Sequence, residues 1–578
     1  MFTDERRSPR ALLLPSLGSW SRQAKSSPFT RGGYAGRCIL GLIVSFVGAC
    51  GAPSITSLNP ASGPERTLVN VRGDVFLAQT IWDAGAAGEQ SVAGGFLGAY
   101  VFSVPAGAVV GAHNVAVQRG ADRSATSPFT VTAALPFGKP RLDRVSIVGT
   151  TFKPGGLVTT WLLVQGANAD VGAEVLIDGV VAPSVAWKAL RNDLLGVNPT
   201  TLGNPIYHHL GIIAASGDHP VGATIGVQLR NLNGDVSDVL PYALPLNATT
   251  MDSDGDDIPD EWEIHGYDAN GDGTIDVDLP ALGANPHRPD ILLEVDIMTG
   301  LTNNPTPAVF TAMRDAFAHA PFVNVHDSNG IHLILDTSGS IPFSQTTDLT
   351  GADNPAAGFA NFYTLKTANF NNTNRGRLYH YCIWANMRPN GSSGISDVDW
   401  VNGGDDCIVS FDDFQVSMQT VKSMAETLMH EFGHNLNQKH GGENHFTQNP
   451  TYNSVMSYSW QLRTGQSNAT RLTRPVCTPF YYGTAGAVEV NGALPAAIAN
   501  VVDYSQGMGR DLVESSLNEG IGVCNNNPID WNNDGDTADA AASRDVNSDG
   551  DTADTHRDFP NWARLKFVGP RLNGSYGT

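Results

Sequence analysis

His430-Glu-Phe-Gly-His434-Asn-Leu-Asn-Gln-Lys-His440 is the stretch that sets the expected fold and chemistry of this chain. It closes an apolar helical pattern that starts near Gln415. On a helix, His430 and His434 lie one turn apart, so both imidazoles project to the same side. Two imidazoles at this spacing can bind one Zn²⁺ ion, and Glu431 is placed to take a proton from water.

A zinc site of this kind needs a third protein ligand, and His440 is the candidate. His440 lies six residues after His434, so the chain must turn back for its ring to reach the ion. Asn437 is the expected turn position, because Asn tolerates left-handed backbone better than most residues. A downstream Glu, either Glu443 or Glu489, is the alternative third ligand.

The motif resembles that of the metzincin metalloproteases, which is His-Glu-x-x-His-x-x-Gly-x-x-His followed by a Met turn. This chain has Asn437 where the family has Gly. Asn453-Ser-Val-Met456-Ser-Tyr458 is similar to the Met turn, and the resemblance covers roughly residues 290–460. It implies a buried Met456 beneath the metal and a Tyr458 that stabilises an oxyanion.

The same resemblance implies a zinc endopeptidase. The three histidines would hold the ion, and Glu431 would be the general base on a water that the ion acidifies. Apolar runs over Asp290–Met298, Ile331–Leu335, Leu378–Trp384 and Cys407–Phe411 predict strands. Thr306-Pro307 predicts the start of a helix, which gives a mixed α/β region before the motif.

An acidic run upstream of this region has EF-hand spacing, which predicts calcium binding because a hard cation prefers six to eight oxygens. The expected ligands are Asp252, Asp254, Asp256, the Ile258 carbonyl, Asp260 and Glu263. A second loop offers Asp268, Asn270, Asp272, Thr274 and Asp276. Asp257 replaces the usual turn Gly in the first loop, and Leu279 replaces the bidentate Glu in the second.

Two further acidic runs form an internal repeat near the C-terminus. Asp530-Trp-Asn-Asn-Asp534-Gly-Asp536-Thr-Ala-Asp539 recurs fifteen residues later as Asp545-Val-Asn-Ser-Asp549-Gly-Asp551-Thr-Ala-Asp554. Calcium is the favoured interpretation, although the ligand at the twelfth position is not evident. A flexible acidic linker is the alternative for all of these runs.

The N-terminal half predicts β-sandwiches. Residues 53–133 resemble an Ig-like IPT/TIG module, through Pro60-Ala-Ser-Gly63-Pro64, the alternation around Val69 and the closing Phe129-Thr-Val-Thr. Residues 138–246 have similar short strands and an Asn233-Gly234 hairpin signal, which predict a second sandwich.

The first fifty residues resemble a bacterial lipoprotein signal. A basic leader precedes the apolar run Ile39–Val47, which is too short to span a bilayer, and Val47-Gly-Ala-Cys50 resembles a lipobox. Lipidation of Cys50 would anchor an exported chain at the bacterial surface or outer membrane. Four other cysteines suit an exported protein, and the preferred pairs are Cys382–Cys407 and Cys477–Cys524.

Composition completes the expected organisation. The 578 residues exceed a single core, charged residues make up only 16%, and Gly (62) and Pro (34) favour short strands and turns. The net charge of −22 argues against nucleic acid as a partner. The expected domains are a signal peptide at 1–50, an IPT/TIG domain at 51–135, a second Ig-like sandwich at 136–247, EF-hand-like or thrombospondin-3-like calcium loops at 248–289, and an α+β metzincin-like domain at 290–578.

Two functions follow from different readings of these features. The first is a zinc-dependent endopeptidase that hydrolyses extracellular or surface proteins, with Zn²⁺ and Ca²⁺ as cofactors. The second is a calcium-binding surface adhesin or scaffold with a catalytically silent protease-like domain. Glu431 favours the enzyme, because a silent descendant is free to lose its base. The sequence indicates neither the substrate nor the oligomeric state.

Overall fold

The structure is a computed structural model that describes residues 52–567 with internal gaps. The segments outside the described residues are 1–51, 60, 64, 66, 76–77, 93, 97–99, 106, 133–138, 170–171, 192–208, 323, 325–329, 399–402, 413–418, 445–448, 450, 453, 459–460, 463–475, 478–488, 491–501, 508–510, 522–527, 548 and 568–578. The predicted signal segment, Cys50 and Cys524 therefore lie outside them. Strands predominate over helices, and several sheets are antiparallel, as the sequence predicted.

The first β region consists of two sheets that share one core. One sheet has the order β1 (Ser57–Asn59), β3 (Leu68–Arg72), β7 (Tyr100–Ser103), β6 (Gly94–Phe96). The other has the order β2 (Ser62–Gly63), β10 (Ser127–Val131), β8 (Gly111–Arg119), β4 (Gln79–Trp82), β5 (Gln90–Val92), with β9 (Asp122–Arg123) paired to β8. Val69 and Phe102 from the first sheet pack with Trp82 and Phe129 from the second. Strand alternation thus buries one face of each sheet.

The second β region repeats this two-layer plan with longer strands. Its sheets have the orders β11 (Arg141–Lys153), β12 (Leu157–Ala167), β16 (His209–Pro220), β15 (Val185–Arg191), and β14 (Val180–Val181), β13 (Glu174–Ile177), β17 (Thr224–Arg230), β18 (Leu240–Ala243). Leu162 and Ile212 of one sheet pack with Val175 and Val227 of the other. All pairings in both sheets are antiparallel.

A mixed sheet follows, and it carries the zinc-ligand candidates. Its order is β20 (His332–Asp336), β19 (Asp290–Met298), β24 (Tyr379–Ala385), β26 (Asp406–Ser410), β25 (Gly394–Ser396), with β21 (Ser340–Ile341) paired to β19. All pairings are parallel except that of the edge strand β25, which runs antiparallel to β26. The four predicted strands are confirmed within one residue at each end. The edge strand β25 was not predicted, because its short Gly- and Ser-rich sequence lacks an apolar pattern.

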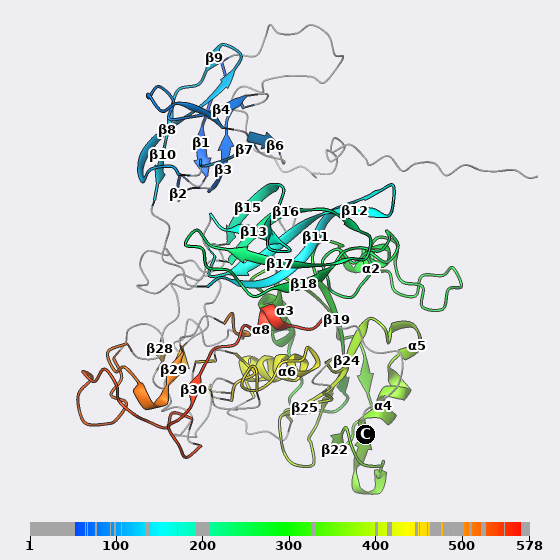
Figure 1. Cartoon of the computed structure of the whole chain (residues 1–578). Coiled ribbons are helices and arrows are strands. Elements are labelled where there is room, and N and C mark those ends of the chain that lie inside the picture. The colour runs from blue at the N-terminus through cyan, green and yellow to red at the C-terminus, as the bar shows by residue number, and fades with distance from the viewer. Residues whose placement is uncertain are drawn as a thin grey trace, which may run out of the picture. The chain divides into compact units, whose positions relative to one another are not determined.

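Two helices cover this sheet. Helix α3 (Pro307–Ala318) begins at Pro307 as expected, although the Thr306 side chain makes no cap hydrogen bond. Helix α6 (Val421–Asn435) begins after Thr420, whose hydroxyl accepts a hydrogen bond from the Ser423 amide. It packs against α3, β25 and β26 (Figure 1). Nearly every residue of α6 is buried, so the helix is held from several sides.

The remaining elements are short. They are α1 (Asp260–His265), α2 (Leu279–Leu282), β22 (Thr346–Asp348), η3 (Pro355–Ala357), β23 (Phe359–Asn361), α4 (Phe362–Asn369), α5 (Asn372–Arg375), β27 (Val476–Cys477), β28 (Glu489–Val490), β29 (Leu512–Val513), η6 (Glu514–Ser516), β30 (Thr555–His556) and α8 (Asn561–Arg564). Among the residues that the structure describes, none of the helices has both the length and the apolar composition that a bilayer span requires.

The predicted disulfide Cys382–Cys407 is confirmed. The two cysteines lie opposite each other on the adjacent strands β24 and β26, and their sulfurs are bonded. The other predicted pair lies outside the described residues at Cys524, and only the backbone of Cys477 is described.

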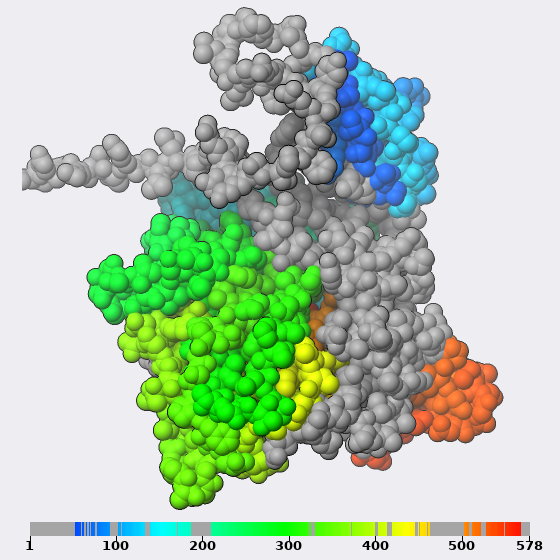
Figure 2. Space-filling model, turned by 180° about the vertical axis from the view of Figure 1, so that it is seen from behind, coloured from blue at the N-terminus to red at the C-terminus, as the bar shows by residue number. Residues whose placement is uncertain are grey.

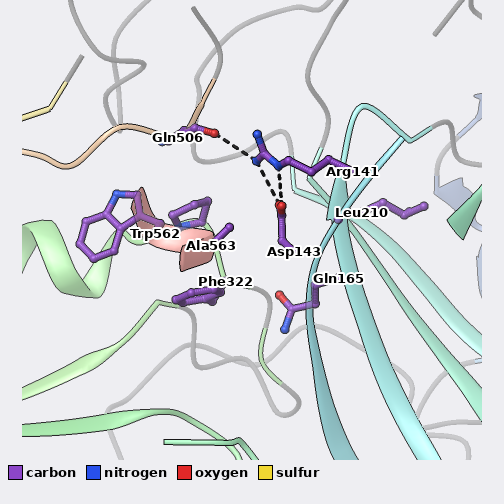
Figure 3. A pocket seen from close by; sticks show the side chains of 10 residues that line it. Arg141, Asp143, Gln165, Leu210, Phe322, Gln506, Trp562 and Ala563 are labelled. Carbon is purple, nitrogen blue, oxygen red and sulfur yellow. Dashed lines mark hydrogen bonds and ion pairs between the residues drawn. The ribbon is translucent and has the colours of Figure 1, made fainter. Parts of the chain in front are cut away.

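The second β region contacts the C-terminal part of the chain through Arg141, the first residue of β11. Arg141 donates to the carbonyl oxygens of Gly507 (3.2 Å) and Gln506 (3.1 Å), and it pairs with Asp143 at 2.5 Å. Arg141, Asp143 and Gln506 line a small pocket together with Trp562 (Figure 3). The predicted second sandwich is therefore joined to residues close to the histidine motif in space.

Candidate functional site

Helix α6 ends at Asn435, just before the predicted turn toward His440. The φ angle of Asn437 is +64°, so the chain adopts left-handed backbone there and reverses direction. Gly433 lies at a point of close approach, since a Cβ atom on it would lie 2.5 Å from Met456 Sδ and 2.8 Å from Tyr504 Oη. A glycine inside the helix thus lets Met456 pack directly against α6 beside His434.

The structure brings His430, His434 and His440 together. One ring nitrogen from each lies within 4.8 Å of the others. The Nε2 atoms of His434 and His440 are 3.1 Å apart, and the ring centroids of the three pairs are 4.8 to 5.1 Å apart. Of the two alternative third ligands, Glu443 is exposed, and the side chain of Glu489 lies outside the described residues.

Backbone carbonyls fix the orientation of two of these rings. The Nδ1 atom of His430 lies 2.8 Å from the Val455 carbonyl oxygen, and that of His434 lies 2.7 Å from the Gln438 carbonyl oxygen. Donation from Nδ1 leaves the Nε2 lone pair for a metal. Burial, together with the nearby His434 and His440, holds the pKa of His430 well below its usual range. Three imidazoles converging in this way fit a zinc ion.

Glu431 is buried and contacts the edge strand β25. Its Oε2 atom lies 3.0 Å from the Ser396 hydroxyl, which is also 2.6 Å from the Glu431 carbonyl oxygen. Burial raises the pKa of Glu431 to about 8, while the Ser396 hydrogen bond and Arg388 oppose the shift. A Cβ atom on Gly394 would lie 2.5 Å from Glu431 Oε1, so that position has no room for a side chain. Neither Ser396 nor Gly394 was predicted to lie at the site, because the strand β25 that carries them was not predicted.

The other two residues implied by the resemblance also lie at this cluster. Met456 is fully buried against Gly433, as described above. The ring centroid of Tyr458 is 5.7 Å from that of His430 and 4.7 Å from that of His440. Tyr458 is partly exposed, so its ring borders the cluster on a side that solvent reaches.

The C-terminal segment supports the turn between His434 and His440, and no sequence signal indicated this. The Asn561 side-chain amide donates to Gln438 Oε1 at 2.7 Å and to the Tyr452 hydroxyl at 2.5 Å. Gln438 is the residue whose carbonyl holds the His434 ring. The Lys566 amide donates to the Leu436 carbonyl oxygen at 3.2 Å. Residues far apart in the sequence thus fix the backbone that positions the candidate ligands.

The first acidic loop folds as a tight turn of buried carboxylates. Asp257, which replaces the usual Gly, has a φ of +70°. Asp252 accepts hydrogen bonds from the amides of Gly255 (2.7 Å) and Asp257 (2.9 Å). The carboxylates of Asp252, Asp254 and Asp256 have oxygens within 4.8 Å of one another. This part of the expected ligand set is therefore assembled.

A second group of carboxylates extends the first loop. Asp256 and Glu263 gather with Asp290, the first residue of β19, within the same 4.8 Å limit. Burial, with Asp254 and Asp290 nearby, raises the pKa of Glu263 to about 11. Among the described residues, neither carboxylate oxygen of Asp254 has a hydrogen-bond partner, although both are buried. Buried carboxylates arranged in this way fit a divalent cation, and Asp290 is a further ligand candidate that no motif in the sequence indicated.

Two other residues of the first loop have different surroundings. Both carboxylate oxygens of Asp260 accept hydrogen bonds from Ser253, one from its amide and one from its hydroxyl, each at 2.7 Å. The side chain of Ile258 is buried in the core next to the mixed sheet. The Ser253 carbonyl accepts a hydrogen bond from the Ile147 amide of β11 at 2.5 Å, which ties the loop to the second β region.

The second acidic loop is more exposed. Asp268 and Asp272 accept hydrogen bonds from amides of the loop itself, as does Asn270. Asp276 accepts from the Ala269 amide at 2.9 Å and from the Asn374 side chain at 2.7 Å. Thr274 is also exposed. These contacts close the turn by themselves, so calcium at this loop stays a prediction.

We expect the melting temperature to rise with free Ca²⁺, since an ion bound only by the folded state stabilises it by about 2.7 kcal/mol at a hundredfold excess over Kd. Asp254→Ala combined with Asp256→Ala should flatten this response. Glu261→Ala, which removes an exposed acid of α1, is the control. An unchanged calcium titration in the double variant would contradict the assignment.

Comparisons with known proteins give no family. No protein-family model matches the chain, and no curated protein matches it. A gamma-CGTase from alkalophilic Bacillus clarkii matches at 13% identity over 34% of this chain and 26% of that one, with a TM-score of 0.13. SGBP-B from a xyloglucan utilization locus of Bacteroides uniformis matches at 16% identity over 35% of this chain and 52% of that one, with a TM-score of 0.13. The chain therefore spans about a quarter and about half of the lengths of these two proteins.

Proposed function

We propose that the chain is a zinc-dependent endopeptidase. The observation that carries the proposal is the convergence of His430, His434 and His440 at the end of a helix that also bears the buried Glu431. The order of strand, helix, strands and ligand-bearing helix, followed by a turn to the third histidine, supports the resemblance to metzincins. When bound, a zinc ion supplies the positive charge that acidifies water and polarises a peptide carbonyl.

Side chains of the protein would carry out the other parts of the proposed mechanism. The three imidazoles would hold the ion as neutral ligands, so its charge would not be cancelled. Glu431 accepts a proton from the attacking water and returns it to the leaving amine, and the Ser396 hydroxyl orients its carboxylate. Tyr458 lies beside His440, where its hydroxyl can donate to the developing oxyanion.

The edge position of β25 supports a peptide as the substrate. Among the strands that the structure describes, its neighbour in the sheet is β26, and the order of the sheet ends with β25. An extended peptide can add to such an edge through main-chain hydrogen bonds, which read no particular side chain. Because Ser396 of β25 also contacts Glu431, a peptide paired there would lie close to the proposed base.

The direct test is a digest of a broad peptide library by the purified chain loaded with one zinc. We expect internal cleavage that stops when a chelator removes the metal and returns when zinc is added back. The calcium-binding scaffold is the second candidate, supported by the two β regions and the buried carboxylates of the first loop. A zinc-loaded chain that cleaves no member of the library would favour it.

We propose also that the mature chain is anchored through a lipidated Cys50, on the basis of Val47-Gly-Ala-Cys50. Cys50→Ser should move the protein from the membrane fraction to the soluble fraction of a bacterial host, because the lipid is its only proposed anchor. Cys38→Ser, which changes the residue just before the apolar run of the signal, is the matched control and should leave the distribution unchanged. Retention of Cys50→Ser in salt-washed membranes would refute the anchor.

A further inference from the structure

Each of the two C-terminal acidic repeats is contacted by a glutamate from the segment 514–519, which precedes both repeats in the chain. The Trp531 amide of the first repeat donates to Glu519 Oε1 at 2.8 Å. The Val546 amide, fifteen residues later in the second repeat, donates to Glu514 Oε1 at 2.8 Å. The two glutamates therefore occupy equivalent positions. Their order in the chain is reversed, because Glu514 precedes Glu519 but contacts the second repeat.

Main-chain hydrogen bonds repeat the same relation. The Glu519 amide donates to the Asp539 carbonyl at 2.9 Å, and the Glu514 amide donates to the Asp554 carbonyl at 3.0 Å. The Glu519 carbonyl accepts from the amide at position 529, and the Glu514 carbonyl accepts from the amide fifteen residues later, at 2.9 and 3.0 Å. Glu514 and Glu519 therefore make the same main-chain hydrogen bonds to their respective repeats.

The two sites differ at the second carboxylate oxygen. Glu519 Oε2 accepts a hydrogen bond from the Asp539 amide at 3.3 Å. Glu514 is 0% exposed, and its Oε2 atom is buried with no hydrogen-bond partner among the described residues. An ionised oxygen left in this state is costly unless a cation binds it. The oxygens of Glu514 and Asp554 lie within 4.8 Å of each other and of a His556 ring nitrogen.

His556 contacts the Oε1 atom of Glu514 and not the unpartnered Oε2 atom. Its Nε2 atom lies 3.0 Å from Glu514 Oε1, which also accepts from the amides of Val546 and Asn547. These contacts fix the carboxylate through Oε1 and leave Oε2 without a hydrogen-bond partner among the described residues. His556 is therefore a positioning residue for Glu514.

The chemistry of the surrounding donors favours a hard cation. The second repeat places Asp545, Asn547, Asp549 and Asp551 at alternate positions, followed by Asp554, so nearly every available donor is an oxygen. The Asn547 side-chain amide contacts both Asp549 (3.1 Å) and Asp554 (2.9 Å), which brings these carboxylates to one place. In Figure 2 the residues of this segment (orange) lie at the molecular surface, where an ion can enter.

We propose that the second repeat binds a calcium ion and that Glu514, from outside the repeat, supplies the carboxylate that its twelfth position lacks. The glutamate reaches the loop from the turn that η6 forms, so the ligand set is split between two segments about thirty residues apart. This site is independent of the proposed peptidase activity, because it involves none of the zinc-ligand candidates.

The test counts calcium ions per chain by native mass spectrometry and calorimetric titration of the full chain. Glu514→Gln keeps the size of the side chain but removes its charge, and we expect it to bind one calcium fewer than the parent. Asp511→Asn is the matched control, since it removes an exposed carboxylate three residues away that pairs with Arg557, and it should lose none. Equal calcium counts for Glu514→Gln and the parent would overturn the proposal.

Two further arms keep the result decisive. If Glu514→Gln does not fold, Asp549→Asn replaces it, because Asp549 is exposed and its loss should remove the same ion without disturbing the core. Zinc is titrated into a His440→Ala chain, which lacks one of the proposed zinc ligands. Binding of one zinc that displaces a calcium and depends on both Glu514 and His556 would overturn the calcium assignment and make this a histidine-carboxylate site.

Discussion

Glu431→Ala should bind one zinc per chain as the parent does. Its rate of peptide hydrolysis should fall by at least ~10²–10⁴-fold, which is the usual contribution of a positioned general base. The zinc content should persist because Glu431 is not among the three clustered ligands. The fold should persist as well, since burial disfavours the charged form of this carboxylate and raises its pKa to about 8. Zinc analysis, turnover on a library-derived peptide and a melting curve measure the three quantities.

The matched control for this variant is Glu443→Ala. Glu443 is an exposed glutamate a few residues beyond the motif and is also the alternative third ligand considered from the sequence. If His440 is the ligand, Glu443→Ala retains both zinc and activity. A Glu431→Ala protein that hydrolyses peptides at the parent rate would show that another base acts, and the proposed mechanism would fail.

His440→Ala should behave differently, because it removes one of three metal donors. We expect loss of stoichiometric zinc after dialysis and, with it, loss of hydrolysis. The ring of His440 reaches the cluster only through the left-handed turn at Asn437, so its removal leaves the helix and the other two histidines in place. The melting temperature of the zinc-free variant should therefore match that of the chelated parent.

The control for this prediction is His265→Ala, which removes an exposed imidazole at the end of α1. It should keep one zinc and full activity. Retention of tightly bound zinc by His440→Ala would identify a different third ligand and would not by itself exclude an enzyme. Read beside Glu431→Ala, the pair separates metal binding from proton transfer.

The parts of the candidate site that could be predicted from the sequence are those set by local geometry. The spacing of His430 and His434 follows from the helical repeat, and the reversal at Asn437 follows from the backbone tolerance of Asn. The strand Asp290–Met298 was predicted from its apolar run with the correct bounds. Each of these signals lies within about ten residues of the feature that it predicts.

The parts that the sequence did not reveal depend on long-range contacts. Asp290 was interpreted as the start of a strand, although its carboxylate gathers with Glu263 of the acidic loop. Ser396 lies on a short edge strand with no apolar pattern, and Glu514 precedes its repeat by about thirty residues. Neither periodicity nor motif spacing relates residues that only the folded chain brings together.

The contact of Asn561 with Gln438 has a consequence for the order of events during synthesis. Residues 561–566 leave the ribosome more than a hundred residues after His440, and under the proposed export they would enter a secretion channel in the same order. A partly delivered chain holds all three histidines but lacks the amides of Asn561 and Lys566 that fix the turn between them. Under the proposed function and the proposed export, the nascent protein would be inactive while it crosses the membrane, and the export machinery would not be exposed to its activity.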